Sequence, residues 1–163
     1  MTQPSRRAVL LGALSALAAS PAFAQVSGFG TIEVDVRPLQ ARGVGPAAEL
    51  LRQVIGAEAR TIFADRLVRG GPRLVVVLNT LQMAAYAGGG SGGTFRGGGG
   101  GGNDYLDGEA LVLGPRGEIL RRVPQLFAQP ADAGGAWFDP ESERRRVIQL
   151  GRNYTAWLRR TLG

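Results

Sequence analysis

The stretch YLDGEALVLGPRGEILRRV, residues 105–123, decides the fold class of this chain. Two runs with the composition of strands, residues 105–113 and 118–123, flank the tetrapeptide GPRG at 114–117. Glycine and proline between two such runs are typical of a tight turn, so the stretch predicts a β-hairpin. Because a hairpin pairs its two strands in opposite directions, we expect an antiparallel sheet.

The segments outside the hairpin show alternating strand and helix patterns. Residues 31–37 alternate apolar and charged side chains, which is the period of a half-buried strand. Residues 45–68 carry apolar residues at helical spacing, and residues 73–86 begin with the apolar run of a central strand. A final helix is predicted over 140–161. The order β-α-β-β-β-α indicates an α+β domain, a single antiparallel sheet of about four strands covered by two helices.

The final helix has two distinct faces. Asp139 and Pro140 are typical of an N-cap and a first helical residue. One face is apolar and consists of Val147, Leu150, Tyr154, Trp157 and Leu158. The other carries an arginine stripe at seven-residue spacing, which consists of Arg145, Arg152 and Arg159. Three further arginines lie around the stripe: Arg144, Arg146 and Arg160. The stripe is either a docking surface for an acidic partner, such as a phosphate-rich lipid head group, or the solvated face of an amphipathic helix.

An export signal is predicted at the N-terminus. Two arginines precede the apolar run AVLLGALSALAAS, residues 8–20, and an A-x-A cleavage motif ends at Ala24. The run is shorter than the roughly 20 residues that a membrane-spanning helix needs. We therefore expect residues 1–24 to be a signal peptide cut before Gln25, using the general or the twin-arginine route. The remaining residues, 25–163, form a single domain that is periplasmic or secreted.

The composition excludes several kinds of site. The chain has no cysteine and no histidine, which removes disulfides, thiolate metal sites, lipid attachment through cysteine and the commonest general base. All 19 basic residues are arginine, and the predicted signal peptide holds two of them and no acid. The exported chain thus has 17 cations against 13 acids, a net charge of +4. Because no aromatic residues alternate with the helical arginines, we expect no nucleic-acid partner.

A glycine-rich segment, residues 88–102, precedes the hairpin and is expected to be a flexible loop, since glycine loses the most entropy on ordering. Phe95 and Arg96 lie at its middle and are candidate partner-docking residues. The overlapping stretch GGGGNDYLDG, residues 99–108, matches one turn of a calcium-binding nonapeptide repeat. Its candidate ligands are Asp104, Asp107 and Glu109. Such repeats hold each ion between successive turns and no second turn follows, so calcium binding is a secondary hypothesis and no metal or cofactor is expected.

A carboxylate-based hydrolase, such as a glycosidase, is the enzymatic alternative, because it needs neither histidine nor cysteine. Glu33 and Asp35 share one face of a predicted strand, and Asp107 and Glu109 share one face of another. A cleft that holds two carboxyl groups roughly 5–10 Å apart would favour this hypothesis. Strand alternation alone also explains both pairs, so we expect no catalytic residues.

A family resemblance rests on the glycine-rich loop, the strand YLDGEALV at 105–112 and the return strand. This arrangement resembles small bacterial envelope proteins of unknown function. The element order is similar to that of the lipopolysaccharide-assembly lipoprotein and of the auxiliary lipoproteins of envelope transporters. The chain departs from them in lacking a cysteine for lipid attachment, and in carrying Arg121 and Arg122 where an aromatic residue would be typical.

The resemblance implies a non-catalytic periplasmic domain that binds a larger partner, and it transfers no catalytic residues. We therefore expect an exported accessory protein of the cell envelope that does not span the membrane. Its partner would be another envelope protein or an acidic surface. The alternatives are the carboxylate-based hydrolase and a calcium- or anion-binding protein.

Overall fold

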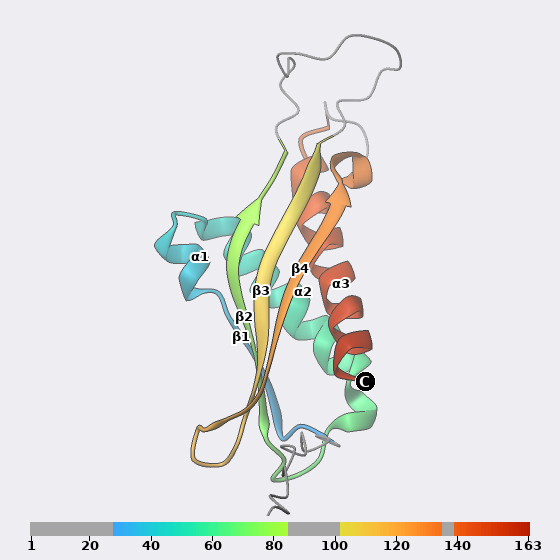
Figure 1. Ribbon diagram of the computed structural model, residues 1–163. Coiled ribbons are helices and arrows are strands. Elements are labelled where there is room, and N and C mark those ends of the chain that lie inside the picture. Colours follow the sequence, from blue (N-terminus) through green and yellow to red (C-terminus); the bar gives the residue numbers. More distant parts are fainter. Residues whose placement is uncertain (1–27, 85–101, 135–138) are drawn as a thin grey trace, which may run out of the picture.

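The computed structural model describes residues 28–84, 102–134 and 139–163. They form one four-stranded sheet in the order β1-β2-β3-β4, with helices on one of its faces (Figure 1). The elements are β1 (Thr31–Asp35), α1 (Arg37–Ala41), α2 (Gly45–Ile62), η1 (Ala64–Arg66), β2 (Arg73–Gln82), β3 (Asn103–Leu113), β4 (Ile119–Pro130), η2 (Ala131–Gly134) and α3 (Ser142–Leu162). The α+β class and the four strands are confirmed.

The first strand differs from the prediction in its direction. β1 pairs parallel to β2, while β2, β3 and β4 pair antiparallel, so the sheet is mixed. The reason is the helix between them. α2 has 18 residues and returns the chain to the end of the sheet where β1 began, so β2 starts from that end as well. The sequence analysis also missed α1, a short helix with Pro38 in its first turn, where proline is well tolerated.

The hairpin turn lies where the sequence predicted it. Gly117 has a φ of 82°, a left-handed conformation that glycine adopts without a steric penalty. The Gly114 N–H donates to the Glu118 carbonyl at 2.8 Å and closes the turn. The return strand β4 extends to Pro130, well beyond the predicted end at residue 123.

The core fills the space between the sheet and the helices α2 and α3. Every second residue of β3 is buried on the helix side, in phase with the buried residues of β2. The largest fully buried side chains include Leu51, Ile55, Leu74, Leu106, Leu150 and Leu158. Gly151 allows α2 and α3 to approach closely, because a Cβ atom there would lie 3.1 Å from the Val54 side chain. This layer pair places one face of the sheet out of contact with water.

The beginning of α3 also corrects a prediction. The helix starts at Ser142, and neither Asp139 nor Pro140 belongs to it. The Asp139 carboxylate accepts the Glu141 N–H at 2.9 Å, and its carbonyl accepts the Ser142 N–H. Asp139 therefore closes a turn that leads into the helix. Trp157, predicted for the apolar face, is 47% exposed.

Two glutamines fix α3 on strand β4. The Gln125 amide donates to the Tyr154 carbonyl at 2.8 Å, and the Gln129 amide donates to the Arg146 carbonyl at 3.0 Å. Four residues of a strand span about 13 Å, and eight residues of a helix span about 12 Å. The equal spacing lets both hydrogen bonds form at once, which sets the position of the helix along the strand.

Two predictions lie outside the described residues: the signal peptide over 1–24 and the glycine-rich loop up to residue 101. Among the helices that the structure describes, none combines the length and the apolar character needed to cross a membrane.

Candidate functional site

The second face of the sheet is the candidate functional site. The long helices α2 and α3 both pack on the opposite face (Figure 1), and among the described helices only the short α1 reaches its margin, where Arg37 and Gln40 lie near Val75. In a sheet with one solvated face, the outward positions are ordinarily polar. Here five outward positions are aliphatic: Val75, Val77, Leu111, Leu113 and Leu126. We refer to these five residues as the open sheet face.

Neighbouring strands bring these side chains together. Val75 is paired with Leu111, so two aliphatic side chains lie side by side on adjacent central strands. Four of the five are half-buried by their neighbours, and Leu126 is 63% exposed. Leu126 is paired with Asp107 and lies apart from the other four residues. Exposed apolar clusters such as that of Val75 and Leu111 are typical of interaction sites.

Charged residues surround the open sheet face. Arg122 pairs with Glu109 at 3.2 Å, and Arg73 pairs with Glu33 at 3.6 Å. Such exposed pairs contribute little to stability. Because Glu109 is paired with Val77 and Asp107 with Leu126, charged groups lie among the aliphatic side chains, where they can orient a partner of complementary pattern.

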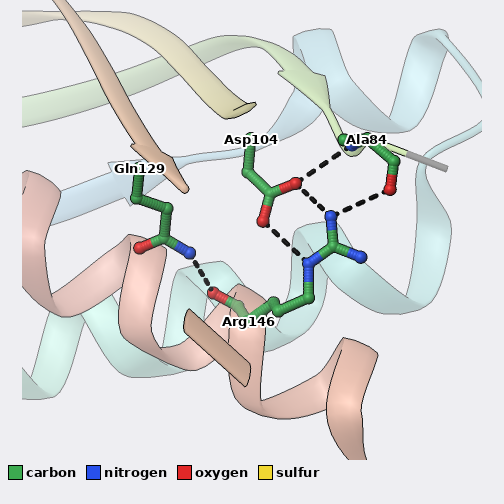
Figure 2. A network of polar contacts seen from close by, with 4 residues as sticks. All are labelled: Ala84, Asp104, Gln129 and Arg146. Carbon is green, nitrogen blue, oxygen red and sulfur yellow. Dashed lines mark hydrogen bonds and ion pairs between the residues drawn. The ribbon is translucent and has the colours of Figure 1, made fainter. Parts of the chain in front are cut away.

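The calcium candidate Asp104 belongs to a buried polar network at one end of the sheet. Figure 2 shows its carboxylate facing the guanidinium of Arg146, which comes from α3. The Arg146 Nε donates to Asp104 Oδ2 at 2.9 Å, and Nη2 contacts both Asp104 Oδ1 and the Ala84 carbonyl. The Ala84 N–H donates back to Asp104 Oδ1 at 3.0 Å. With side-chain exposures of 3% and 0%, the two charges compensate each other away from water.

This network holds the base of the glycine-rich segment. Ala84 is the last described residue before the segment, and Gly102 is the first one after it. The Gly102 carbonyl accepts the Ala131 N–H at 2.9 Å, which ties it to the end of β4. The polar network therefore joins the end of β2, the start of β3 and the first turns of α3.

The sequence analysis placed Arg146 among the surface arginines, and this was wrong. Arg146 lies four residues before Leu150 and eight before Tyr154, so it shares their buried face. Asp104 likewise lies in phase with Leu106 and the other buried residues of β3. Arg146 and Asp104 each fall at a position where the sequence pattern predicts a buried residue. Two opposite charges at such positions were the signal that could have revealed the pair.

The structure does not bring the three calcium candidates together. Asp104 faces the helices, whereas Asp107 and Glu109 occupy the other face of the same strand. Among the described residues, no three acidic side chains gather into a group that could hold a metal ion. The two outward carboxylates act across the sheet instead: burial, assisted by their negative charges, raises the pKa of Tyr154 above its ordinary value.

The arginine stripe is only partly available for a partner. Arg145 pairs with Asp139 at 2.7 Å, and Arg159 pairs with Asp65 at 2.8 Å. Arg152 is exposed. The other docking candidates, Phe95 and Arg96, lie outside the described residues.

The predicted carboxylates Glu33 and Asp35 line a groove of about 370 Å³, together with Glu49 from α2. A glycosidase needs one carboxyl group with a raised pKa to act as the general acid. The hydrogen bond from Arg37 lowers the pKa of Asp35, and hydrogen bonds from Arg52 and Gln53 lower the pKa of Glu49 to about 2. Two of the three carboxylates in the groove are thus held in the ionised form, which counts against the hydrolase alternative.

Comparison with known proteins adds a likeness of fold. No protein-family model matches the chain, and no curated protein matches it significantly. A crystal structure from Caulobacter crescentus, described as a "putative lipoprotein", is similar to it with 10% sequence identity. The match covers 86% of this chain and 90% of that chain, with a TM-score of 0.49. At this level of similarity the neighbour carries no information about function.

Proposed function

We propose that this chain is an exported, non-catalytic accessory protein of the cell envelope that binds another envelope protein through the open sheet face. The observation that carries the proposal is the set of five aliphatic side chains at outward positions of a sheet whose other face is already covered. Apolar outward positions gain free energy when a partner removes them from water. The expected partner has an apolar patch with charges of both signs at its rim.

The envelope location rests on the sequence of residues 1–24. N-terminal sequencing of the protein recovered from the periplasm should begin at or near Gln25. Replacing both signal arginines with lysine, Arg6→Lys and Arg7→Lys, distinguishes the two export routes. Export that survives the double substitution identifies the general route, and export that is lost identifies the twin-arginine route.

Site-specific photocrosslinking in intact cells tests the binding surface. The crosslinking amino acid replaces Ala128, which is exposed on β4, or Ala156, which is exposed on the outer face of α3 and serves as the control. We expect an adduct with one envelope protein, identified by mass spectrometry, from position 128 and none from position 156.

A charge placed on the open sheet face completes the test. Leu126→Asp changes the most exposed residue of the open sheet face, and we expect it to lower the adduct yield about tenfold. Ala57→Asp, at an exposed position of α2, is the matched control and should leave the yield unchanged. An adduct that survives Leu126→Asp would contradict the proposal, and an adduct between two copies of this chain would assign the face to a homodimer.

A further inference from the structure

Exposed apolar side chains gather at one end of the domain, away from the buried network. The described residues include six exposed large hydrophobic side chains, and five of them lie at this end. They are Leu67, Val68, Ile119, Leu120 and Trp157, with exposures of 43–50%. Isolated exposed hydrophobic residues are ordinary, but a concentration at one end indicates a contact surface.

The topology brings these residues to the same end. Arg73, at the start of β2, is paired with Leu113, which in turn is paired with Ile119 at the start of β4. The Arg121 guanidinium donates to the Thr161 carbonyl at 3.2 Å, which joins the start of β4 to the last turn of α3. The Arg66 guanidinium donates to the Leu162 carbonyl at 3.0 Å and joins η1 to the same turn. Figure 1 shows the β3–β4 turn and the C-terminal turn of α3 at this end.

Arginines accompany the apolar residues there. Arg69, Arg116 and Arg160 are exposed, and their guanidinium groups form no ion pair within the described residues. The backbone N–H of Arg116 donates to Glu118 Oε2 at 2.9 Å. The Arg160 guanidinium lies over the Trp157 ring, 5.6 Å from its centroid. We refer to these three arginines and the five apolar residues as the basic end.

The two ends of the domain differ in charge. The opposite end carries the acidic residues Asp132, Asp139, Glu141 and Glu143 around the start of α3, where Arg144 pairs with Glu141 and Arg145 pairs with Asp139. These four acids outnumber the two exposed arginines beside them, whereas arginines are in excess at the basic end, so a negatively charged plane orients the domain. Tryptophan, aliphatic loop tips and arginine together are typical of groups that lie at the head-group level of an anionic bilayer.

The chain also enters the domain at the basic end. The Phe29 N–H donates to the Arg66 carbonyl at 2.7 Å, so the described part of the chain begins beside Leu67.

We propose that the basic end docks on an anionic phospholipid surface, with Trp157 and the two loop tips at the head-group level. This inference rests on the exported location in the proposed function but not on the open sheet face, which adjoins the basic end where Leu113 is paired with Ile119. An acidic protein is the competing occupant of the basic end, and the test separates it from lipid.

Vesicle co-sedimentation tests the proposal, with the protein purified from the cell envelope in the form found there. We expect binding to vesicles that contain phosphatidylglycerol, weakened by salt, and little binding to phosphatidylcholine alone. Each arginine near an anionic surface contributes about fivefold in affinity, so Arg69→Gln/Arg116→Gln/Arg160→Gln should bind on the order of 100-fold more weakly. The control Arg37→Gln/Arg42→Gln/Arg52→Gln removes the same charge from exposed positions around α1 and α2 and should bind within about threefold of the unmodified protein.

Tryptophan fluorescence gives the second readout. Trp137→Phe leaves Trp157 as the only tryptophan, and its emission should shift to the blue when phosphatidylglycerol vesicles are added. Three results would overturn the proposal: an equal loss of binding in the two triple variants, binding without a blue shift, and equal binding to neutral vesicles. No binding to anionic vesicles at low salt would also overturn it and would leave an acidic protein as the occupant.

Discussion

Two arginines near opposite ends of α3 have opposite environments. At the first turn the guanidinium of Arg146 is buried and bonded to Asp104, whereas at the last turn Arg160 lies in the open over an exposed tryptophan. The difference follows from the position of each arginine in the helical repeat. Arg146 falls on the helix face that carries Leu150, while Arg160 falls outside it. An arginine of α3 can therefore be buried or exposed, and its position within the helical repeat decides which of the two it is.

The largest expected effect comes from breaking the buried pair. Arg146→Met leaves the Asp104 charge buried without its partner, which should lower the free energy of unfolding by about 3–5 kcal/mol. Arg145→Met, one position earlier, removes an exposed pair and should cost less than about 1 kcal/mol. Urea unfolding of the two variants measures both values.

A double substitution sharpens the result. Asp104→Leu/Arg146→Met replaces both charges with apolar groups and should recover much of the loss, because the cost arises from the unpaired charge. If Arg146→Met is no more destabilising than Arg145→Met, the pair is not buried in solution and the contrast between the two ends of α3 fails.

A second test compares a buried polar group that has partners with one that has none. Within the described structure the Tyr154 hydroxyl is buried without a hydrogen-bond partner, close to Gly108 in the sheet. Tyr154→Phe should therefore change the free energy of unfolding by less than about 1 kcal/mol, in contrast to Arg146→Met.

The glycine opposite this tyrosine should be more sensitive. A Cβ atom at position 108 would lie 2.7 Å from the Tyr154 hydroxyl oxygen and would collide with the Val77 carbonyl. Gly108→Ala should cost about 1–3 kcal/mol in chemical unfolding. Because the backbone collision remains, adding Tyr154→Phe should restore only part of this loss, and full recovery would show that the hydroxyl alone sets the spacing.

The smallest expected effect concerns an exposed pair. Hydrogen bonds from Arg52 and Gln53 lower the pKa of Glu49 from 4.5 to about 2. A lowered folded pKa means that the stabilisation is present above pH 4.5 and is lost as the pH falls toward 2. An NMR titration should place the Glu49 midpoint near 2, and Arg52→Gln should move it up toward 4.5. A midpoint that does not respond to Arg52→Gln would show that the pair does not form in solution.

Local patterns predicted most of the fold. The hairpin at 105–123 and the amphipathic final helix are set by turn residues and by short-range periodicity, so the sequence alone reveals them. The direction of β1 depends on where a helix of 18 residues delivers the chain, which is a property of the assembled domain. The short helix α1 has too few residues to show a periodic pattern.

The candidate site was harder to predict than the fold. The outward residues Val75, Val77 and Leu111 belong to apolar runs that are typical of a strand buried on both faces. Only the assembled layers show that, within the described residues, the long helices leave one face of the sheet uncovered. The calcium hypothesis did not take strand geometry into account. Asp104 and Asp107 are three residues apart on a strand, so their side chains point to opposite faces.

The base of the glycine-rich segment offers a practical opportunity. Ala84 and Gly102 are so close that a Cβ atom on the glycine would press against the Ala84 side chain, and the Asp104–Arg146 pair holds this junction. Any sequence inserted between them leaves the sheet and returns to it at a single point. A fluorescent protein or an affinity tag grafted there would report on the protein in living cells while the domain beneath keeps its shape.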